Sequence, residues 1–230
     1  MKKYNKKIMI LIFFIGIFCL MYPKIGNIIN NEKQKKVLDN YKNTINIINK
    51  DKLNNIYEEA VIYNEKIYNL QKEDKKYNLD IIYENMLKVD DNAIIGYINI
   101  PKLNRKIPIY HGVSDSVLQN GVGHVKETSL PIGTNNQNSM LLGHSGLATN
   151  EIFTDLEKIE NDDIFIISVL DKLFYYKVID IEIITPDKLK DKIYVEDGLT
   201  LVTLVTCTPY AINTHRLVVK AELIKKEDNI

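Results

Sequence analysis

From residue 93 to the C-terminus, the chain alternates short apolar segments with turn residues, and this texture limits its fold more than any other feature. The stretch "AIIGYINIPKLNRKIPIYHG" predicts two short strands around a turn at Lys102–Arg105. Pro101 and Pro108 stand at strand ends, where a missing backbone N–H costs least. Further strands are expected in "SMLLGH", "DDIFIISVLDKLFYYKVIDIEII", "GLTLVTLVTC" and "THRLVVKAELI", the second of which predicts a hairpin that turns at Leu170–Lys172.

Helices are expected to play a small part in this region. The segment "SDSVLQNG" predicts a short helix, capped by Ser114 and Asp115 and ended near Gly121, and "NEIFTDLEKI" predicts another. Because many short strands occur without alternating helices, the pattern favours a mainly β fold. Its architecture is expected to be a closed or nearly closed β-barrel with short helices.

The N-terminus carries a targeting signal. "MKKYNKK" holds four lysines and no acid, and the apolar run "IMILIFFIGIFCLMY" follows over residues 8–22. The length of this run allows both a membrane-spanning helix and a cleaved signal peptide. Because no small-x-small cleavage site follows, we favour an uncleaved anchor over residues 8–25, with residues 1–7 as a cytoplasmic tail. Lysines on the N-terminal side predict that the rest of the chain lies on the extracellular face.

Residues 26–92 separate this anchor from the predicted barrel at 93–230. Their Asn- and Lys-rich first part is expected to be a polar stalk with some helix. In "LNNIYEEAVIYNEKIYNL", residues 53–70, apolar side chains recur at helical spacing, which predicts an amphipathic helix packed against the barrel. Residues 71–92 are interpreted as a charged, solvated linker, and a regulatory lid is the alternative.

The charge of the chain is balanced, with 30 basic and 30 acidic residues. Without a net positive field, or a basic cluster interleaved with aromatic residues, nucleic acid is not an expected partner. The two cysteines are Cys19, inside the apolar run, and Cys207, far away in the β region. Such a pair does not make a disulfide framework, so Cys207 is either inert in the core or kept for its reactivity.

Cys207 ends an apolar strand in "TLVTLVTCTPYAINTHRLVV". If this strand pairs antiparallel with the next one, Arg216 lies beside Cys207 on the same sheet face and His215 points to the opposite face. A nucleophilic thiol needs a base or a positive neighbour, and it needs donors for the oxyanion, a task that suits a guanidinium. Of the four histidines, His144 ends "SMLLGH", where a loop can expose it. A buried structural cysteine is the alternative, and the residues alone leave both open.

Three stretches resemble the sortases, a family of membrane-anchored cysteine transpeptidases of Gram-positive bacteria. "TLVTCTPYAINTHRLVV" is similar to the family's Thr-Leu-x-Thr-Cys strand with its later Arg, and "SMLLGHSGL" is similar to the segment with the catalytic His. "GYINIPKLNRKIPIYHGVSDSVLQNGVGHVKETSLPIG" resembles the first strands of class C, the pilin-type members. The likeness covers roughly residues 93–222 and implies a closed sortase-type β-barrel.

The resemblance implies a two-step acyl transfer. Cys207 would attack the Thr carbonyl of a sorting signal resembling Leu-Pro-x-Thr-Gly, Arg216 would steady the oxyanion, and His144 would protonate the departing Gly amine. The resulting thioester would be resolved by an amine, either a pilin lysine or a peptidoglycan precursor. The expected partners are surface or pilin proteins with a C-terminal sorting signal. Neither a cofactor nor a metal is expected. The activity is expected to have a bell-shaped dependence on pH.

Other residues near Cys207, His144 and Arg216 in the sequence, and the remaining histidines, are given roles as follows. Thr206, Ser145 and His124 are candidates for contact with the substrate. Packing within the strand is the alternative for Thr206, and a structural role is the favoured alternative for His124. His111 and His215 are expected to be structural.

The chain departs from the pilin-type pattern in two places. Asp80 is followed by Ile81, whereas the lid of that class carries Pro or Ser and an aromatic residue at this point. The chain ends in polar "AELIKKEDNI", whereas that class tends to have a C-terminal membrane helix. Attachment to pili and attachment to the cell wall therefore both stay open.

Other classes of protein fit the residues less well. An L,D-transpeptidase would place its Cys and Arg in one Gly-Cys-x-Arg cluster, and a papain-like peptidase would place its Cys at the start of a helix. Outside enzymes, the alternative is a non-catalytic, membrane-tethered barrel that binds surface proteins as a scaffold. A thioester trapped with a sorting peptide, and lost in Cys207→Ala, would separate an enzyme from such a scaffold.

Overall fold

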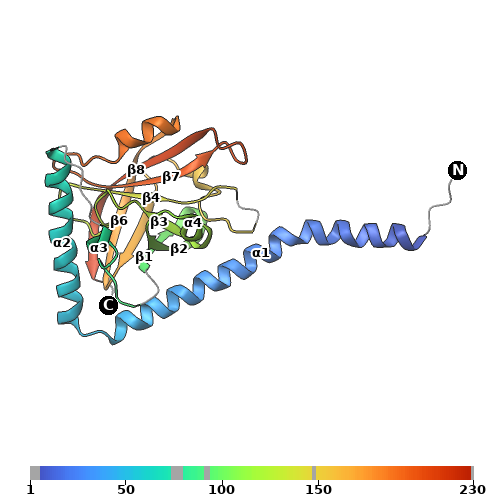
Figure 1. Ribbon diagram of the computed structural model, residues 1–230, viewed down its shortest axis with the longest axis horizontal. Helices are drawn as coiled ribbons and strands as arrows, with labels where there is room; N and C mark the ends of the chain where they lie inside the picture. The colour runs from blue at the N-terminus through green and yellow to red at the C-terminus, as the bar shows by residue number, and fades with distance from the viewer. Residues whose placement is uncertain (1–5, 74–79, 91–93, 147–148, 229–230) are drawn as a thin grey trace.

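The computed structural model describes residues 6–73, 80–90, 94–146 and 149–228, and its centre is a closed β-barrel. The strands are β1 (Ile94–Ile100), β2 (Arg105–His111), β3 (Val122–His124), β4 (Gln137–Leu142), β5 (Ile164–Val169), β6 (Lys172–Ile184), β7 (Thr200–Thr208) and β8 (His215–Asp228). They follow the order β1-β2-β3-β4-β7-β8-β6-β5, and β5 pairs with β1 to close the barrel (Figure 1). The pairs β2–β3 and β4–β7 are parallel. The predicted mainly β closed barrel is confirmed.

Turns join the strands largely where the sequence predicts them. β1 and β2 flank a single 3-10 turn, η1 (Pro101–Leu103), after which Asn104 adopts a left-handed φ of 51°. Asn tolerates this conformation better than most residues, which explains its place in the turn. α4 (Asp115–Asn120) begins at the predicted cap, because the Ser114 hydroxyl accepts a hydrogen bond from the backbone N–H of Val117 at 3.4 Å.

The helix predicted from "NEIFTDLEKI" is wrong, since only one 3-10 turn, η2 (Leu156–Lys158), forms there. Ile152 and Phe153 are buried against the barrel. The backbone N–H of Phe153 donates to the carbonyl of His144 at 3.0 Å. Because this donor is used by the preceding strand end, it is not available for a helical bond, and tertiary contacts override the helical pattern.

Apolar side chains from every strand fill the barrel interior. The fully buried members of this core include Ile98, Ile109, Leu141, Ile167, Phe174, Tyr176, Leu204 and Val219. The Tyr176 hydroxyl accepts a hydrogen bond from the Gln137 side chain at 3.1 Å, so its polar end is satisfied inside the core.

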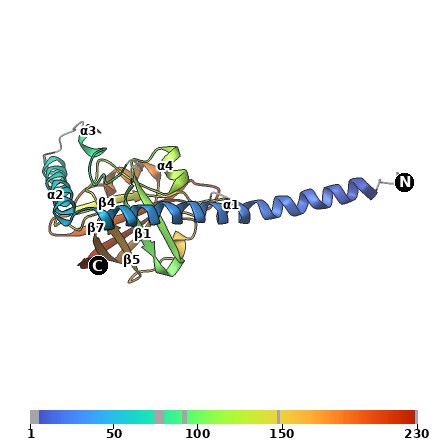
Figure 2. The same cartoon turned by 90° about the horizontal axis from the view of Figure 1, so that it is seen from below.

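α1 (Lys6–Ile47) is one continuous helix whose C-terminal half packs along the barrel (Figures 1 and 2). The segment expected to be a polar stalk is therefore docked. One helix face carries the barrel contacts at spacings of three and four residues, through Asn27, Asn30, Gln34, Leu38, Tyr41 and Ile45. The Tyr41 hydroxyl donates to the Ile95 carbonyl at 3.2 Å and accepts from the Leu170 N–H at 2.8 Å.

The N-terminal half of α1 projects away from the barrel (Figure 1). Its apolar side chains are exposed, and by length and composition this helix is able to cross a membrane. Pro23 lies inside α1, where its ring removes one backbone hydrogen bond. Figure 1 shows the helix changing direction between its free and docked halves.

α2 (Lys50–Lys72) confirms the amphipathic helix predicted at 53–70. Its buried face includes Leu53 and Ile67, as the helical spacing indicates. The apolar pattern did not indicate Asn64, which is buried on the same face. Its side chain donates to the Leu130 carbonyl at 2.9 Å and accepts from the Leu130 N–H at 2.7 Å, so an amide fastens α2 to the barrel.

Part of the expected linker at 71–92 is packed against the barrel. Residues 74–79 and 91–93 lie outside the described residues. The predictions of a linker and of a lid are therefore compared with the structure only for residues 71–73 and 80–90. α3 (Asp80–Tyr83) opens the described segment 80–90, in which Tyr83 and Leu87 are buried. A fully solvated linker is therefore wrong for these residues.

Candidate active site

Cys207 and Arg216 are direct partners in the antiparallel β7–β8 ladder. Paired residues of such a ladder project to the same face, with Cβ atoms about 4.5–5.5 Å apart. The register therefore brings the thiol and the guanidinium to one face of the sheet. His215 pairs with Thr208 and precedes Arg216 by one residue, so it projects to the opposite face.

The parallel β4–β7 ladder brings His144 beside Cys207. Leu142 pairs with Val205, and the Gly143 N–H extends the ladder by donating to the Val205 carbonyl at 3.0 Å. His144 and Cys207 each lie two residues beyond this pair, Cys207 within β7 and His144 in the loop that leaves β4, so the register brings both to the same end of adjacent strands. Both side chains are half-buried.

Cys207 and Arg216 belong to the outer face of the barrel. An apolar cluster on this face, called the outer strip below, consists of Met140, Ile184, Val205 and Val218. Leu204, the residue before Val205 in the strand, belongs instead to the barrel core. Because side chains alternate along a strand, Cys207 lies on the side of Val205 and Arg216 on the side of Val218. The outer strip therefore leads directly to the candidate nucleophile.

Two loops lie beside Cys207 and Arg216 at this end of the barrel. They consist of residues 144–146 and residues 209–214, and together they are called the mouth below. The Arg216 guanidinium donates to the carbonyl oxygens of Asn213 and His215 at 3.1 and 2.9 Å, which fixes it to the β7–β8 connection. The two loops touch, because a Cβ at Gly146 would lie 3.5 Å from the Tyr210 ring. The mouth is therefore a single rim built from both loops.

Thr206 faces away from Cys207 along the strand and binds the neighbouring strand. Its buried hydroxyl donates to the Gly143 carbonyl at 2.8 Å. This contact ties β7 to the end of β4 next to His144, in agreement with the packing interpretation of Thr206. Ser145 is half-buried in the mouth, and its contact with a substrate stays a prediction.

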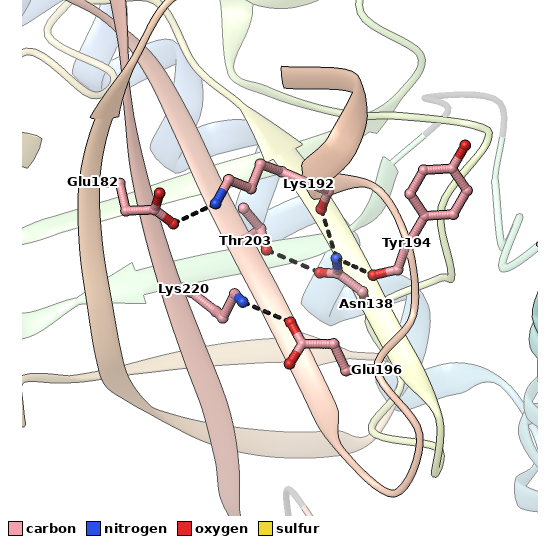
Figure 3. Close-up of polar contacts among 7 residues, drawn as sticks. All are labelled: Asn138, Glu182, Lys192, Tyr194, Glu196, Thr203 and Lys220. Atoms are coloured by element: carbon pink, nitrogen blue, oxygen red, sulfur yellow. Dashed lines mark hydrogen bonds and ion pairs between the residues drawn. The ribbon is translucent and has the colours of Figure 1, made fainter. Parts of the chain in front are cut away.

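The connection between β6 and β7 is fastened over the outer face by a buried amide (Figure 3). It contains η3 (Pro186–Lys192). The Asn138 side chain donates to the carbonyls of Lys192 and Tyr194 at 2.8 and 2.9 Å. Its amide oxygen accepts from the Thr203 hydroxyl at 2.9 Å. One asparagine thus joins β4, β7 and the connection.

Two ion pairs fasten the same connection (Figure 3). The Lys192 ammonium donates to Glu182 at 2.5 Å, and Lys220 donates to Glu196 at 2.6 Å. The hydrogen bond from Lys192 lowers the pKa of the Glu182 carboxyl, because it stabilises the charged form. Apolar side chains that pack on the outer strip from this connection are Leu189 and Ile193. The connection therefore forms a wall that covers the outer strip.

His124, a candidate substrate contact, is buried in the interior with 0% of its surface exposed. Its Nε2 lies 2.8 Å from the Ser129 carbonyl, and its Nδ1 lies 2.9 Å from the Tyr83 hydroxyl. Because a carbonyl only accepts, Nε2 carries the proton and Nδ1 accepts from Tyr83. In this arrangement the ring offers no surface to a substrate, so the predicted contact would require the segment 80–90 to move.

The same segment is held by a second histidine, His111. Its Nε2 donates to the Met86 carbonyl at 2.8 Å, and its ring meets the Tyr83 ring edge-on with centroids 5.1 Å apart. The structural role expected for His111 agrees with these contacts. His111 and His124 therefore act together as the surface on which residues 80–90 dock.

Acidification is expected to destabilise the fold through His124. Burial lowers the pKa of this imidazole from 6.5 to about 4, because it disfavours the charged ring. Between these two values the unfolded chain binds a proton that the folded chain does not, so the free energy of unfolding falls as the pH falls. Roughly 2 kcal/mol should be lost between pH 7 and pH 5 through this group.

Urea unfolding of the protein and of His124→Gln at both pH values measures this contribution. The variant starts with a lower free energy of unfolding, but its loss between the two pH values should be smaller by the amount that His124 contributes. Equal losses in the two proteins would contradict a neutral, buried His124.

Sequence reasoning missed the polar residues that fasten the wall and the docked segment. Asn138 interrupts the apolar strand "QNSMLL", and a buried amide at such a position signals a specific partner. Tyr83 gave no comparable signal, because its partners come from β2 and β3. Within the described ranges, no group of three His, Cys, Asp or Glu side chains is placed to hold a metal ion.

Comparison with known proteins gives the class. The family model described as Sortase domain matches residues 98–224. Sortase A of Bacillus anthracis is 28% identical over 137 residues, which are 59% of this chain and 62% of that protein. The crystal structure of sortase C1 from Streptococcus agalactiae has a TM-score of 0.77 and 35% identity, and the match covers 83% of this chain and 98% of that one. Clostridium perfringens sortase C with the C-terminal cell wall sorting motif has a TM-score of 0.73 and 35% identity, with 83% and 98% covered.

The fold is thus a closed barrel with a cysteine and an arginine paired near the ends of adjacent strands and a histidine just beyond the end of the next strand. The chain belongs to the sortase family, since the family model matches more than half of its residues. The resemblance seen in the sequence is confirmed, and the solved structures above are sortases C, in agreement with a class C barrel. The chain spans about three fifths of the length of the curated relatives it matches, 62% and 61% for two sortases A.

Proposed function

We propose that this protein is a membrane-anchored cysteine transpeptidase that cleaves a sorting signal of the Leu-Pro-x-Thr-Gly type between Thr and Gly. One observation carries the proposal: Cys207 pairs with Arg216 on the outer face, and His144 lies two residues beyond the end of the adjacent strand β4. A thiol, an imidazole and a guanidinium at one end of the barrel are the groups that acyl transfer through a thioester requires.

The reaction balances with these three side chains alone. The Cys207 thiolate forms a bond to the Thr carbonyl carbon, and the Arg216 guanidinium stabilises the oxyanion. The C–N bond to Gly breaks as His144 gives its proton to the leaving amine, which leaves a thioester. An acceptor amine then attacks the thioester, loses a proton to His144 and forms the new amide, which releases the thiolate.

The outer strip supports the site from below and is not itself a surface for the peptide. Its side chains are at most 9% exposed, because Leu189 and Ile193 of the wall pack on them. In the proposal, the Leu-Pro part of the signal binds at the mouth beside Cys207, which brings the Thr carbonyl to the thiol. Burial of such side chains favours binding by about 25 cal/mol per Å² of apolar surface.

The partners proposed for this chain are surface or pilin proteins that carry a C-terminal sorting signal. Two similar structures support this class of substrate. The Clostridium perfringens sortase C has been solved with the C-terminal cell wall sorting motif, and the crystal structure of Streptococcus pneumoniae sortase C bears on that enzyme's pilin substrate specificity. A pilin lysine and a peptidoglycan amine are the two acceptors to be tested.

The exposed apolar half of α1 supports the membrane anchor. In the proposal this half spans the membrane once, with the lysines before it on the cytoplasmic side and the barrel on the extracellular face.

Incubation of the full chain in detergent with a Leu-Pro-x-Thr-Gly peptide and an amine tests the function. A lysine-bearing pilin peptide is offered in one reaction and a peptidoglycan stem peptide in the other. Mass spectrometry should find the acyl part joined to one of these amines at Thr, with release of a fragment that begins at Gly. A peptide that is bound but not cleaved would support a role as a non-catalytic scaffold and contradict the proposed transpeptidase activity.

Replacement of Arg216 by Ala is expected to lower kcat by about 10²–10³-fold, the usual effect of losing an oxyanion donor. Arg216→Lys should recover only part of this loss, since an ammonium keeps the charge but not the forked geometry. The measurement is the steady-state kcat and KM for the peptide. Lys225→Ala, which removes a cation from the far end of the same strand, is the matched control. An Arg216→Ala protein with the kcat of this control would contradict the assigned role.

A further inference from the structure

The docked half of α1 grips the loop that follows His144. The Asn30 side chain donates to the Thr149 carbonyl at 2.6 Å, and the Asn27 side chain donates to Glu151 at 3.0 Å. The Gln34 side chain donates to the buried Asn150 side chain at 3.2 Å. Three amides on one helix face thus hold three consecutive residues of a single loop.

The helix also approaches this loop as closely as its backbone allows. A Cβ at Gly26 would lie 2.5 Å from the Cβ of Thr149, so only glycine fits at this position of α1. A few residues further along the loop, the Phe153 N–H donates to the His144 carbonyl at 3.0 Å. The grip of α1 is therefore close in the chain to the strand end that carries His144.

The point of contact lies where α1 leaves its exposed apolar run. Gly26 is four residues beyond Tyr22, the end of that run, which corresponds to about 6 Å along the helix. Exposed apolar residues lie on both sides of this point in the sequence, Ile25 before Gly26 and Ile28 and Ile29 after it, on the face of α1 that turns away from the loop. One turn of α1 therefore has the barrel on one side and an unpartnered apolar surface on the other.

The mouth lies at the same end of the barrel. In both views the β7–β8 connection, coloured orange-red, is on the side from which the free half of α1 projects (Figures 1 and 2). This connection exposes the large apolar side chains Tyr210 and Ile212, and its contact with Gly146 links it to the loop after His144. An aromatic and an aliphatic residue at a loop tip suit the boundary between lipid and water.

We propose that α1 holds the mouth of the active site against the surface of the membrane that it spans, with Tyr210 and Ile212 in contact with the lipid interface. The proposal rests on the membrane anchor in the proposed function, and it adds a fixed orientation of the barrel. The partner that the apolar loop tip contacts is the phospholipid bilayer. The tip lies against Gly146, in the loop that α1 holds, and in the proposed function α1 itself enters the bilayer.

Single tryptophans test this arrangement, because the chain has no Trp of its own. Ile212→Trp places the fluorophore at the mouth, and Ile47→Trp places it at the far end of α1, where Ile47 is 85% exposed. The two ends of the docked helix are about 30 Å apart at 1.5 Å per residue. Each full-length variant is inserted into bilayer discs made with brominated phosphatidylcholine, and its emission is compared with that in unbrominated discs.

The Ile212→Trp emission should be quenched about twofold or more and shifted to shorter wavelength, as for a side chain at the membrane interface. The Ile47→Trp emission should not change. Quenching of Ile212→Trp no stronger than that of Ile47→Trp would overturn the proposal. Phe14→Trp, within the apolar run, separates this failure from failure of the anchor: if Phe14→Trp is not quenched, the anchor itself is wrong.

The grip is tested in the same Ile212→Trp background. Asn27→Ala together with Asn30→Ala should reduce the quenching toward the Ile47→Trp value, because the barrel can then tilt away from the membrane. Asn31→Ala, an exposed neighbour on the same helix, should leave the quenching unchanged. Equal quenching in the double variant and in this control would show that the amides do not hold the mouth in place.

Discussion

Cys207→Ala is expected to abolish both thioester formation and transfer, and this is the largest effect that we predict. The sulfur forms the covalent intermediate, and alanine supplies no nucleophile, so turnover should fall to background, a loss of at least about 10⁴-fold. The measurement is release of the Gly-containing fragment from a sorting peptide by the full chain in detergent. The change removes one half-buried atom, so the barrel should keep its fold.

Cys19→Ala is the matched control for this experiment. Cys19 is the other cysteine of the chain and lies exposed on the free half of α1. Its replacement should leave kcat and KM unchanged. If turnover survived in Cys207→Ala and disappeared in Cys19→Ala, the nucleophile would be Cys19, which would contradict the proposed site.

His144→Ala is expected to have the second largest effect, a loss of about 10²–10⁴-fold in kcat. His144 follows the strand that pairs with the Cys207 strand, and in the proposed mechanism it protonates the leaving amine and later deprotonates the acceptor. Without it, the protein should also lose the bell-shaped pH dependence that a cysteine and a histidine produce together. The measurement is kcat/KM between pH 5 and 9 for both proteins.

His215→Ala provides the comparison, because His215 adjoins Arg216 but pairs with Thr208 and projects to the other face. Its pH profile should remain bell-shaped and its kcat close to that of the unmodified chain. A flat profile in the unmodified chain, or equal losses in the two variants, would count against proton transfer by His144.

The barrel and part of the site could be predicted because their causes are local in the sequence. Strand alternation and turn residues mark each hairpin, and a hairpin with a short connection places Cys207 opposite Arg216. The position of His144 has a different cause. It depends on the parallel pairing of β4 with β7, two strands far apart in the chain, and only the family resemblance indicated it.

The docking of α1 was not predicted because only the second part of its docked face, Leu38, Tyr41 and Ile45, is apolar, and the first part is polar. Asn27, Asn30 and Gln34 bind a loop through amide groups, and such residues look like those of a solvated stalk when they are read as a pattern. The packing of Tyr83 against His124 was missed for a related reason, since a tertiary hydrogen bond leaves no periodic signal. Polar contacts between distant segments therefore mark the limit of sequence-based prediction for this chain.

The proposed mechanism requires above all that the sulfur at position 207 carries the acyl group of the substrate. To test this requirement, the full chain is incubated with a Leu-Pro-x-Thr-Gly peptide in the absence of an acceptor amine. The intact mass of the protein is then measured, and the modified fragment is mapped. We expect one acyl group, attached at Cys207 and released by hydroxylamine. An acyl group attached at Cys19, or a chain that cleaves the peptide without ever carrying it, would contradict the mechanism.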